Sequence, residues 1–148
     1  GMYLDKEITP FDNVKLQTVS MFIHIPCSEK GGVIDEVSGK LDLRPTLLHL
    51  RGIDTKGDIQ LGADIFSPDH EEFVVFRDGR FVTNEYVYTN DVCYDTTTGE
   101  EVDGLACEPY TERTTTELDY SDMIINGDLL RFKEEESNYT KPNEAKIK

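Results

Sequence analysis

The residues best suited to chemistry in this chain form an acidic cluster around one histidine, Asp69-His70-Glu71-Glu72. Carboxylate oxygens and an imidazole nitrogen can hold a metal ion. Adjacent residues cannot all point at one ion, and no second histidine follows at ligand spacing. We therefore expect residues 67–72 to form a solvated polar loop. A small metal-dependent hydrolase built on Asp69 and His70 is the alternative.

The other candidate catalytic side chains lack a suitable neighbour in the sequence. His24 lies in an apolar run and His49 in a predicted helix, so both are expected to be satisfied or edge histidines rather than ligands. Thr46 is expected to cap a helix with its hydroxyl rather than attack a substrate. The threonine triplets 96–98 and 114–116 have no histidine base nearby, and no P-loop or Gly-x-Ser-x-Gly motif occurs. The sequence thus predicts no catalytic residue and no metal ligand, and leaves the substrate-binding residues unknown.

The net charge of the chain limits the classes of partner that it is expected to bind. Thirty acidic and 15 basic residues give a formal net charge of -15, spread along the sequence. Such a field repels phosphate backbones, so a nucleic-acid partner is not expected. No apolar run is long enough to cross a bilayer and no signal peptide is recognised, so we expect a soluble chain. Gly1-Met2 resembles the scar of a removed tag followed by a start residue.

Three cysteines, Cys27, Cys93 and Cys107, leave the redox state open. No Cys-x-x-Cys pair is present, which excludes a zinc knuckle and a thioredoxin-like motif. Cys93 and Cys107 could form a disulfide if the chain is extracellular, closing a loop worth about 3 kcal/mol in the chain-entropy model. Buried free thiols, which are common core residues, are the alternative.

The segment that would organise the first half of the chain is a short helix within residues 41–53. Asp42 is a good N-cap, Pro45 is tolerated in the first turn, and Gly52 can adopt the left-handed conformation that ends a helix. Three leucines recur at helical spacing and predict a buried face, and Ile53 is expected to return the chain to the core. These leucines are Leu43, Leu47 and Leu50.

Other elements surround this helix. A short helix is expected at residues 11–17, and the apolar run 19–26, stopped by Pro26, predicts a buried strand at residues 21–25. Residues 54–58 form a turn cluster.

From residue 73 onward the periodicity changes to two, which predicts an antiparallel meander of three to four strands. Asp78-Gly79 and Asn90-Asp91 mark two tight turns between runs of β-branched and aromatic residues. Glu101-Val102 could add a short edge. Arg77 and Arg80 flank the first turn and are expected in ion pairs, although they could also face an anionic ligand.

A C-terminal helix is expected from about residue 111 to residue 126. Leu118, Ile125, Leu129 and Phe132 share one face by spacing and predict that the helix docks on the sheet. Asn126-Gly127 should end it. Residues 133–148 are polar and read as a frayed tail.

Several of these motifs also resemble a known family. The pattern Asp42-x-x-Pro45-Thr46-Leu47-Leu48-x-Leu50-x-Gly52-Ile53 resembles a segment near the end of the catalytic domain in sulfatases and alkaline-phosphatase-like enzymes. Residues 61–66 resemble that family's Gly-x-Asp-Leu-Phe element, which implies that they pack a surface loop back on the core. Residues 76–83, the tyrosine-rich stretch to Asp95 and residues 121–132 are similar to the lipoteichoic acid synthase branch, whose members are phosphoglycerol transferases. The likeness covers residues 8–132.

The resemblance implies both a fold and a function. It implies an α+β fragment: residues 3–66 would be the C-terminal edge of a sulfatase-like α/β domain, and residues 67–132 an antiparallel sheet with a packed helix. The parent enzyme would transfer glycerol phosphate from phosphatidylglycerol during lipoteichoic acid synthesis. It would do so with Mn or Mg at the outer face of a Gram-positive membrane. The parent's nucleophile and metal ligands precede this stretch, so the chain alone is expected to be inactive and to have the upstream catalytic segment as its partner.

A non-catalytic module that binds cell-wall polymer is a further alternative. Its distinguishing sign would be an aromatic-lined groove on the exposed face of the meander. Tyr86, Tyr88 and Tyr94 are the side chains expected to line it.

Overall fold

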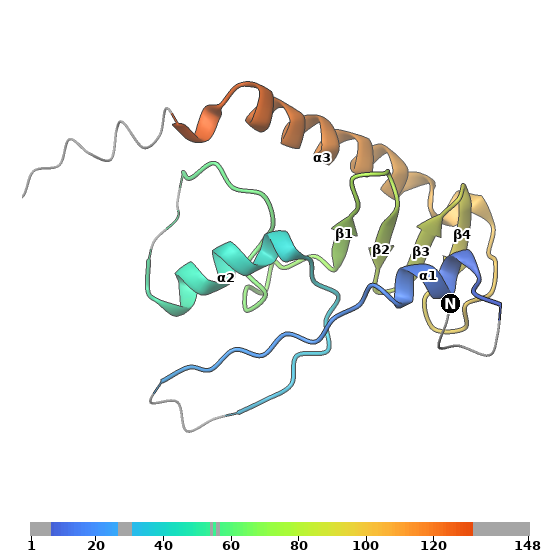
Figure 1. The fold of residues 1–148 in the computed structure, drawn as a ribbon, viewed down its shortest axis with the longest axis horizontal. Helices are drawn as coiled ribbons and strands as arrows, with labels where there is room; N and C mark the ends of the chain where they lie inside the picture. Colours follow the sequence, from blue (N-terminus) through green and yellow to red (C-terminus); the bar gives the residue numbers. More distant parts are fainter. Residues whose placement is uncertain (1–6, 27–30, 54, 56, 132–148) are drawn as a thin grey trace, which may run out of the picture.

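The computed structural model describes residues 7–26, 31–53, 55 and 57–131, and Figure 1 shows their arrangement. The helical elements are α1 (Pro10–Lys15), η1 (Lys40–Asp42), α2 (Leu43–Leu50), η2 (Gly104–Ala106) and α3 (Glu108–Asn126). The strands are β1 (Phe73–Val75), β2 (Phe81–Thr83), β3 (Tyr86–Thr89) and β4 (Val92–Asp95). The fold is α+β, with an antiparallel meander and a C-terminal helix, as the sequence predicts.

The four strands form one sheet in the order β1-β2-β3-β4. Each strand pairs with the next in the chain, with Val74 opposite Val82 and Val87 opposite Tyr94. An isolated bridge between Tyr94 and Glu101 supplies the predicted extra edge. The meander follows from alternating β-branched and aromatic residues interrupted by residues that tolerate positive φ.

Each face of the sheet is covered by a different helix. On one face, Phe81 and the two cysteines Cys93 and Cys107 form a buried cluster with Tyr110 of α3. On the other face, Val87 and Tyr94 pack against Val14 of α1. Figure 1 shows α3 running along one side of the sheet and α1 beside β3. The meander therefore has a core on both sides.

The short helix α1 is stabilised at its first turn by a capping box, in which Thr9 and Asp12 exchange hydrogen bonds between side chain and backbone. The hydroxyl of Thr9 accepts a hydrogen bond from the Asp12 amide at 3.1 Å, and the Asp12 carboxylate accepts the Thr9 amide at 3.2 Å. Pro10 opens the helix with a preset φ. Val14 is its buried residue, and together with Phe11 it packs the helix against the sheet.

The strand predicted at residues 21–25 is not formed. The structure has no regular element there, and Phe22 is 93% exposed. A strand needs a neighbour for its backbone hydrogen bonds, and none of the four described strands reaches this segment. In Figure 1 it runs away from the sheet as an extended arm. The segment is apolar, but the prediction that it forms a buried strand was wrong.

The predicted buried face of α2 is also wrong. Leu43 and Leu47 are exposed, and the buried residues of the helix are Pro45 and Thr46. Ile53 is exposed as well, so it does not return the chain to the core. Helical spacing shows which residues share a face, but it does not show which face meets the rest of the molecule.

In α3 the expected boundaries hold better than the expected face. The helix ends at Asn126, but its buried residues are Thr114 and Ile124, whereas Ile125 is exposed. Leu118 and Leu129 of the predicted face are half-buried, so that face is right only in part. The hydroxyl of the buried Thr114 donates to the Tyr110 carbonyl at 2.8 Å. Phe132 and the tail lie outside the described residues. The division of the chain at residue 66 stays a prediction. Helix α1, which precedes residue 66, packs on the sheet that follows it.

Candidate functional site

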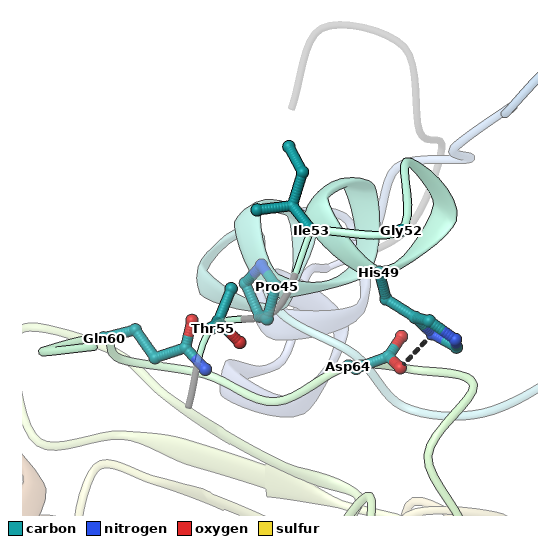
Figure 2. Close-up of a pocket in the computed structure, with 7 residues that line it drawn as sticks. All are labelled: Pro45, His49, Gly52, Ile53, Thr55, Gln60 and Asp64. Carbon is teal, nitrogen blue, oxygen red and sulfur yellow. Dashed lines mark ion pairs between the residues drawn. The ribbon is translucent and has the colours of Figure 1, made fainter. Parts of the chain in front are cut away.

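A surface cavity of about 350 Å³ lies beside α2. One wall is the helix itself, with Pro45, His49 and the terminal Gly52; the other wall is the returning loop, with Gln60 and Asp64. Figure 2 shows the His49–Asp64 pair at one side of this cavity and Gln60 with Thr55 at the other. At this cavity, polar side chains of α2 and of the returning loop reach solvent.

The end of α2 is built as the sequence indicates. Gly52 has a φ of 68° and donates its amide to the His49 carbonyl at 2.8 Å. The Ile53 amide donates to the Leu48 carbonyl at 2.9 Å. These two bonds form a Schellman motif, which needs a residue with positive φ and therefore favours glycine. The motif places His49 on the last turn, over the cavity.

His49 is held by Asp64 rather than by the core. Its Nδ1 forms an ion pair with the Asp64 carboxylate, and its side chain is 58% exposed. An acidic partner on one ring nitrogen orients the imidazole, which is the geometry of a general base. Thr55 is the hydroxyl-bearing residue among those that line the cavity, and Figure 2 places it away from His49. The sequence did not reveal this pair, because 15 residues separate its members.

Asp42 performs a different task from the predicted one. Its carboxylate makes no cap to α2. One oxygen instead accepts the Gly39 amide at 2.7 Å and the other accepts the Ala63 amide at 2.8 Å. The carboxylate thus closes η1 and fastens the loop after residue 60 to the start of α2. Gly62 permits this contact, because a Cβ there would lie 2.4 Å from the Leu41 carbonyl carbon.

Thr46 completes the same junction and is not a nucleophile. It is fully buried; its hydroxyl donates to the Asp42 carbonyl at 2.6 Å and accepts the Ile65 amide at 3.1 Å. Both hydrogen-bonding roles of the hydroxyl are therefore occupied. Ile65 is buried, so residues 61–66 do pack back on the core as expected.

His70 is buried, contrary to the expected solvated loop. Its side chain is 2% exposed; Nδ1 lies 3.3 Å from a Glu36 oxygen and Nε2 lies 3.8 Å from an Asp42 oxygen. Neither ring nitrogen has a hydrogen-bond partner in the described part of the chain. Asp69 and Glu71 are exposed as predicted, and Glu71 pairs with Arg113. The Ser67 carbonyl accepts the His70 amide at 3.0 Å, so a turn at Ser67-Pro68 precedes the buried ring.

Within the described residues no group of three or more His, Cys, Asp or Glu side chains could hold a metal ion. His24 is exposed on the arm, so of the two expected roles, satisfied or edge histidine, burial in a core is the one that the structure does not show. The small-hydrolase alternative therefore gains no support from Asp69 and His70. No helix in the described ranges is long and apolar enough to cross a membrane.

The redox alternatives resolve in favour of a disulfide. Cys93 of β4 and Cys107, just before α3, are bonded with a Cα–Cα distance of 5.9 Å. Both are almost fully buried beneath Tyr110. The bond joins the last strand to the beginning of the C-terminal helix. Cys27 lies outside the described residues.

The first hairpin turn carries the predicted ion pairs. Arg80 contacts the Asp78 carboxylate through Nε and Nη2, each at 2.8 Å, and its guanidinium lies over the Phe76 ring. The hydrogen bond from Arg80 lowers the pKa of Asp78 below its usual value. Gly79 supplies the positive φ of the turn. Arg77 pairs with Asp122 of α3 at 2.6 Å.

The tyrosines do not form the groove expected of a polymer-binding module. Tyr94 is buried against Phe11 of α1. Tyr88 stacks on Phe81 at a centroid distance of 5.1 Å, and Tyr86 approaches Tyr110. Tyr94 is buried in one core, whereas Tyr86 and Tyr88 pack half-buried against the other, so the three rings do not line one groove.

No family model matches the chain, but curated relatives do. The lipoteichoic acid synthase-like protein YvgJ of Bacillus subtilis is 53% identical over 131 residues, which are 86% of this chain and 21% of the relative. Lipoteichoic acid synthase 2 of the same bacterium is 43% identical over 129 residues, 86% of this chain and 20% of the relative. Lipoteichoic acid synthase of Staphylococcus aureus strain USA300 is 36% identical over 147 residues, 98% of this chain and 22% of the relative.

The matches cover nearly the whole chain, whereas the chain spans about a fifth of the length of these relatives. The identity extends over the Pro45 helix, the meander and α3 together, as the sequence motifs predicted. The chain therefore belongs to the lipoteichoic acid synthase-like proteins and corresponds to a C-terminal part of them.

Proposed function

We propose that this chain is the structural C-terminal portion of a phosphoglycerol transferase of the cell envelope. The complete protein would transfer glycerol phosphate from phosphatidylglycerol to growing lipoteichoic acid at the outer face of the cytoplasmic membrane. The observation that carries the proposal is the 36–53% identity to lipoteichoic acid synthases over 86–98% of the chain. The chain's own role is to close and brace the catalytic part, not to react.

The chemistry of the described residues supports a structural role. The hydroxyl of Thr46 donates one hydrogen bond and accepts another, and Thr55, the hydroxyl-bearing residue of the cavity beside the His49–Asp64 pair, lies away from the imidazole. A Mn or Mg ion of the complete enzyme would be held by residues outside this stretch, and it would polarise the phosphate and activate the attacking oxygen. Catalysis would then depend on the upstream catalytic segment as partner.

The distribution of exposed apolar side chains supports that partner. The sheet has a core on both faces, but Phe22 and Val33 are 93% and 94% exposed, and Leu43 and Leu47 of α2 are 38% and 41% exposed. Large exposed apolar side chains can be covered by a partner. In the complete enzyme this surface would pack against the catalytic segment, and the arm would gain the strand neighbours that it lacks here.

A chimera tests the proposal. In Bacillus subtilis lipoteichoic acid synthase 1, which is 42% identical over 130 residues, the matching stretch would be deleted or replaced by this chain. The deletion is expected to abolish lipoteichoic acid production in cells that have no other synthase, and the replacement to restore it. Full production by the deleted form would overturn the structural role.

A further inference from the structure

The chain returns from the arm to η1 along residues 31–39, and two side chains of the loop before β1 fasten this stretch. The Val37 amide donates a hydrogen bond to the Glu72 carboxylate at 2.8 Å. One residue further from η1, a carboxylate oxygen of Glu36 lies 3.3 Å from Nδ1 of His70. Within the described residues, no hydrogen bond or ion pair fastens the part of the stretch that lies beyond this point. The Glu36–His70 contact is therefore the outermost fastening of the returning stretch.

The ring of His70 lies between two carboxylates, one at each nitrogen. Glu36 approaches Nδ1, and on the other edge Nε2 lies 3.8 Å from a carboxylate oxygen of Asp42 in η1. The His70 side chain is 2% exposed, and neither nitrogen makes a hydrogen bond within the described part of the chain. Glu72, which holds the arm beside it, adds a third acidic group to this region. The ion pairs that the described residues give this buried ring are all with carboxylates.

The charge of the ring decides whether both contacts are favourable. A neutral imidazole carries a proton on one nitrogen and a lone pair on the other, whereas an imidazolium carries a proton on both. A neutral ring can therefore attract only one of Glu36 and Asp42, and its lone pair faces the other carboxylate. A charged ring attracts both, and burial leaves this attraction little screened. Histidine side chains change between these forms between about pH 5 and pH 8.

We propose that His70 is a pH-sensitive clasp for the arm. Its charged ring holds Glu36, and with it residues 31–36, against η1; its neutral ring releases them. The contact is thus made on the acidic side of this range and weakened as the pH rises. Val33 and Ile34 lie on the released part and are 94% and 45% exposed, so the clasp sets the position of two exposed apolar side chains. The inference concerns the chain itself and does not rest on the proposed transferase role.

The test is backbone ¹⁵N relaxation of the 148-residue chain at pH 5.5 and at pH 8.5, with the imidazole signals followed between these values. The order parameters of residues 32–36 should fall from the rigid range, about 0.85, toward about 0.6 as the pH rises. Their change should follow the titration of the His70 ring signals. Order parameters that stay constant, or that rise with pH, would overturn the proposal.

Two variants separate the clasp from a general effect of pH. His70→Gln keeps an amide donor but cannot become charged, so residues 32–36 should be as mobile at pH 5.5 as they are at pH 8.5. Glu36→Gln removes one of the two carboxylates, at a side chain that is 48% exposed, and should abolish the response as well. Asp35→Asn, which changes the neighbouring exposed acid, is the control and should keep the response. A response that survives in either clasp variant would contradict the proposal; if His70→Gln does not fold, Glu36→Gln decides.

Discussion

The carboxylate of Asp42 accepts a hydrogen bond from the backbone amide of Ala63 at 2.8 Å, across 21 residues of sequence. Its other oxygen accepts the Gly39 amide. One side chain therefore joins the residue before η1, the start of α2 and the loop that contains Ala63. Charge-assisted bonds of this kind are stronger than neutral ones. The first half of the chain has few buried apolar side chains, so we expect this junction to contribute much of the stability of that half.

We expect Asp42→Ala to destabilise the chain by about 2–3 kcal/mol, because two amides lose a charged acceptor in a buried position. Urea unfolding followed by circular dichroism measures the change. Asp119→Ala, at an exposed position of α3, serves as the control and should change the free energy of unfolding by less than about 0.5 kcal/mol. Equal effects of the two substitutions would show that the Asp42 junction carries no stability.

Two glycines with similar backbone angles should respond differently to alanine. Gly62 has a φ of 80° and lies against the Leu41 backbone, whereas Gly79 has a φ of 85° and nothing within 4 Å of an added Cβ. Gly79→Ala should cost about 1 kcal/mol from the left-handed conformation alone. Gly62→Ala should cost several times more, because backbone atoms must move. Thermal denaturation compares the two directly, and similar Tm values would contradict the close approach.

Reduction of the Cys93–Cys107 bond should destabilise the sheet and α3 together. The bond closes a loop with a sequence separation of 14, so its loss should cost about 3 kcal/mol in the chain-entropy model. The urea midpoint with and without dithiothreitol measures this loss. The double variant Cys93→Ala/Cys107→Ala should show no response to the reductant; a response there would place the effect at another cysteine.

The Asp78–Arg80 pair predicts a small loss of stability in acid. Because the pKa of Asp78 is lower in the folded state, the carboxylate stabilises the fold above its unfolded pKa, near 4. That contribution disappears as the pH falls through the folded value. Both groups reach solvent, so screening should keep the effect below about 1 kcal/mol. The free energies of unfolding of the unsubstituted chain and of the Asp78→Asn variant should therefore differ at pH 6 and converge below pH 3. A difference that grows in acid would contradict a stabilising Asp78–Arg80 pair.

The exposed leucines of α2 should matter in the complete enzyme and not in the chain alone. In the chimera, Leu43→Asn with Leu47→Asn should lower lipoteichoic acid production, because a buried interface would lose apolar area. The unfolding midpoint of the isolated chain should barely change. Leu105→Asn, at an exposed residue of η2, is the matched control. Equal production by both chimeras would locate the partner surface elsewhere.

Sequence reasoning succeeded where local chemistry decides structure. The Asp78-Gly79 and Asn90-Asp91 turns, the alternation around Val87 and the glycine at the end of α2 depend on backbone angles that few residues tolerate. Elements of this kind are specified by their own residues. The meander could therefore be predicted strand by strand.

Placement against other elements was not predictable in the same way. An apolar run such as that around Phe22 is equally compatible with a buried strand and with surface awaiting a partner, and helical spacing does not say which side of α2 is covered. The burial of His70 and the pairing of His49 with Asp64 depend on the loop after residue 60 folding back. Such contacts join residues far apart in sequence, so composition carries no sign of them.

The measurement that tests the central claim most directly is metal-dependent release of the head group from phosphatidylglycerol vesicles. It would be made with Mn²⁺ and Mg²⁺, first for this chain alone and then for the chain joined to the upstream segment of lipoteichoic acid synthase 1. We predict no release by the chain alone and release by the joined protein. Release by the chain alone, abolished by His49→Gln or His70→Gln, would contradict a purely structural role and identify a catalytic site within these residues.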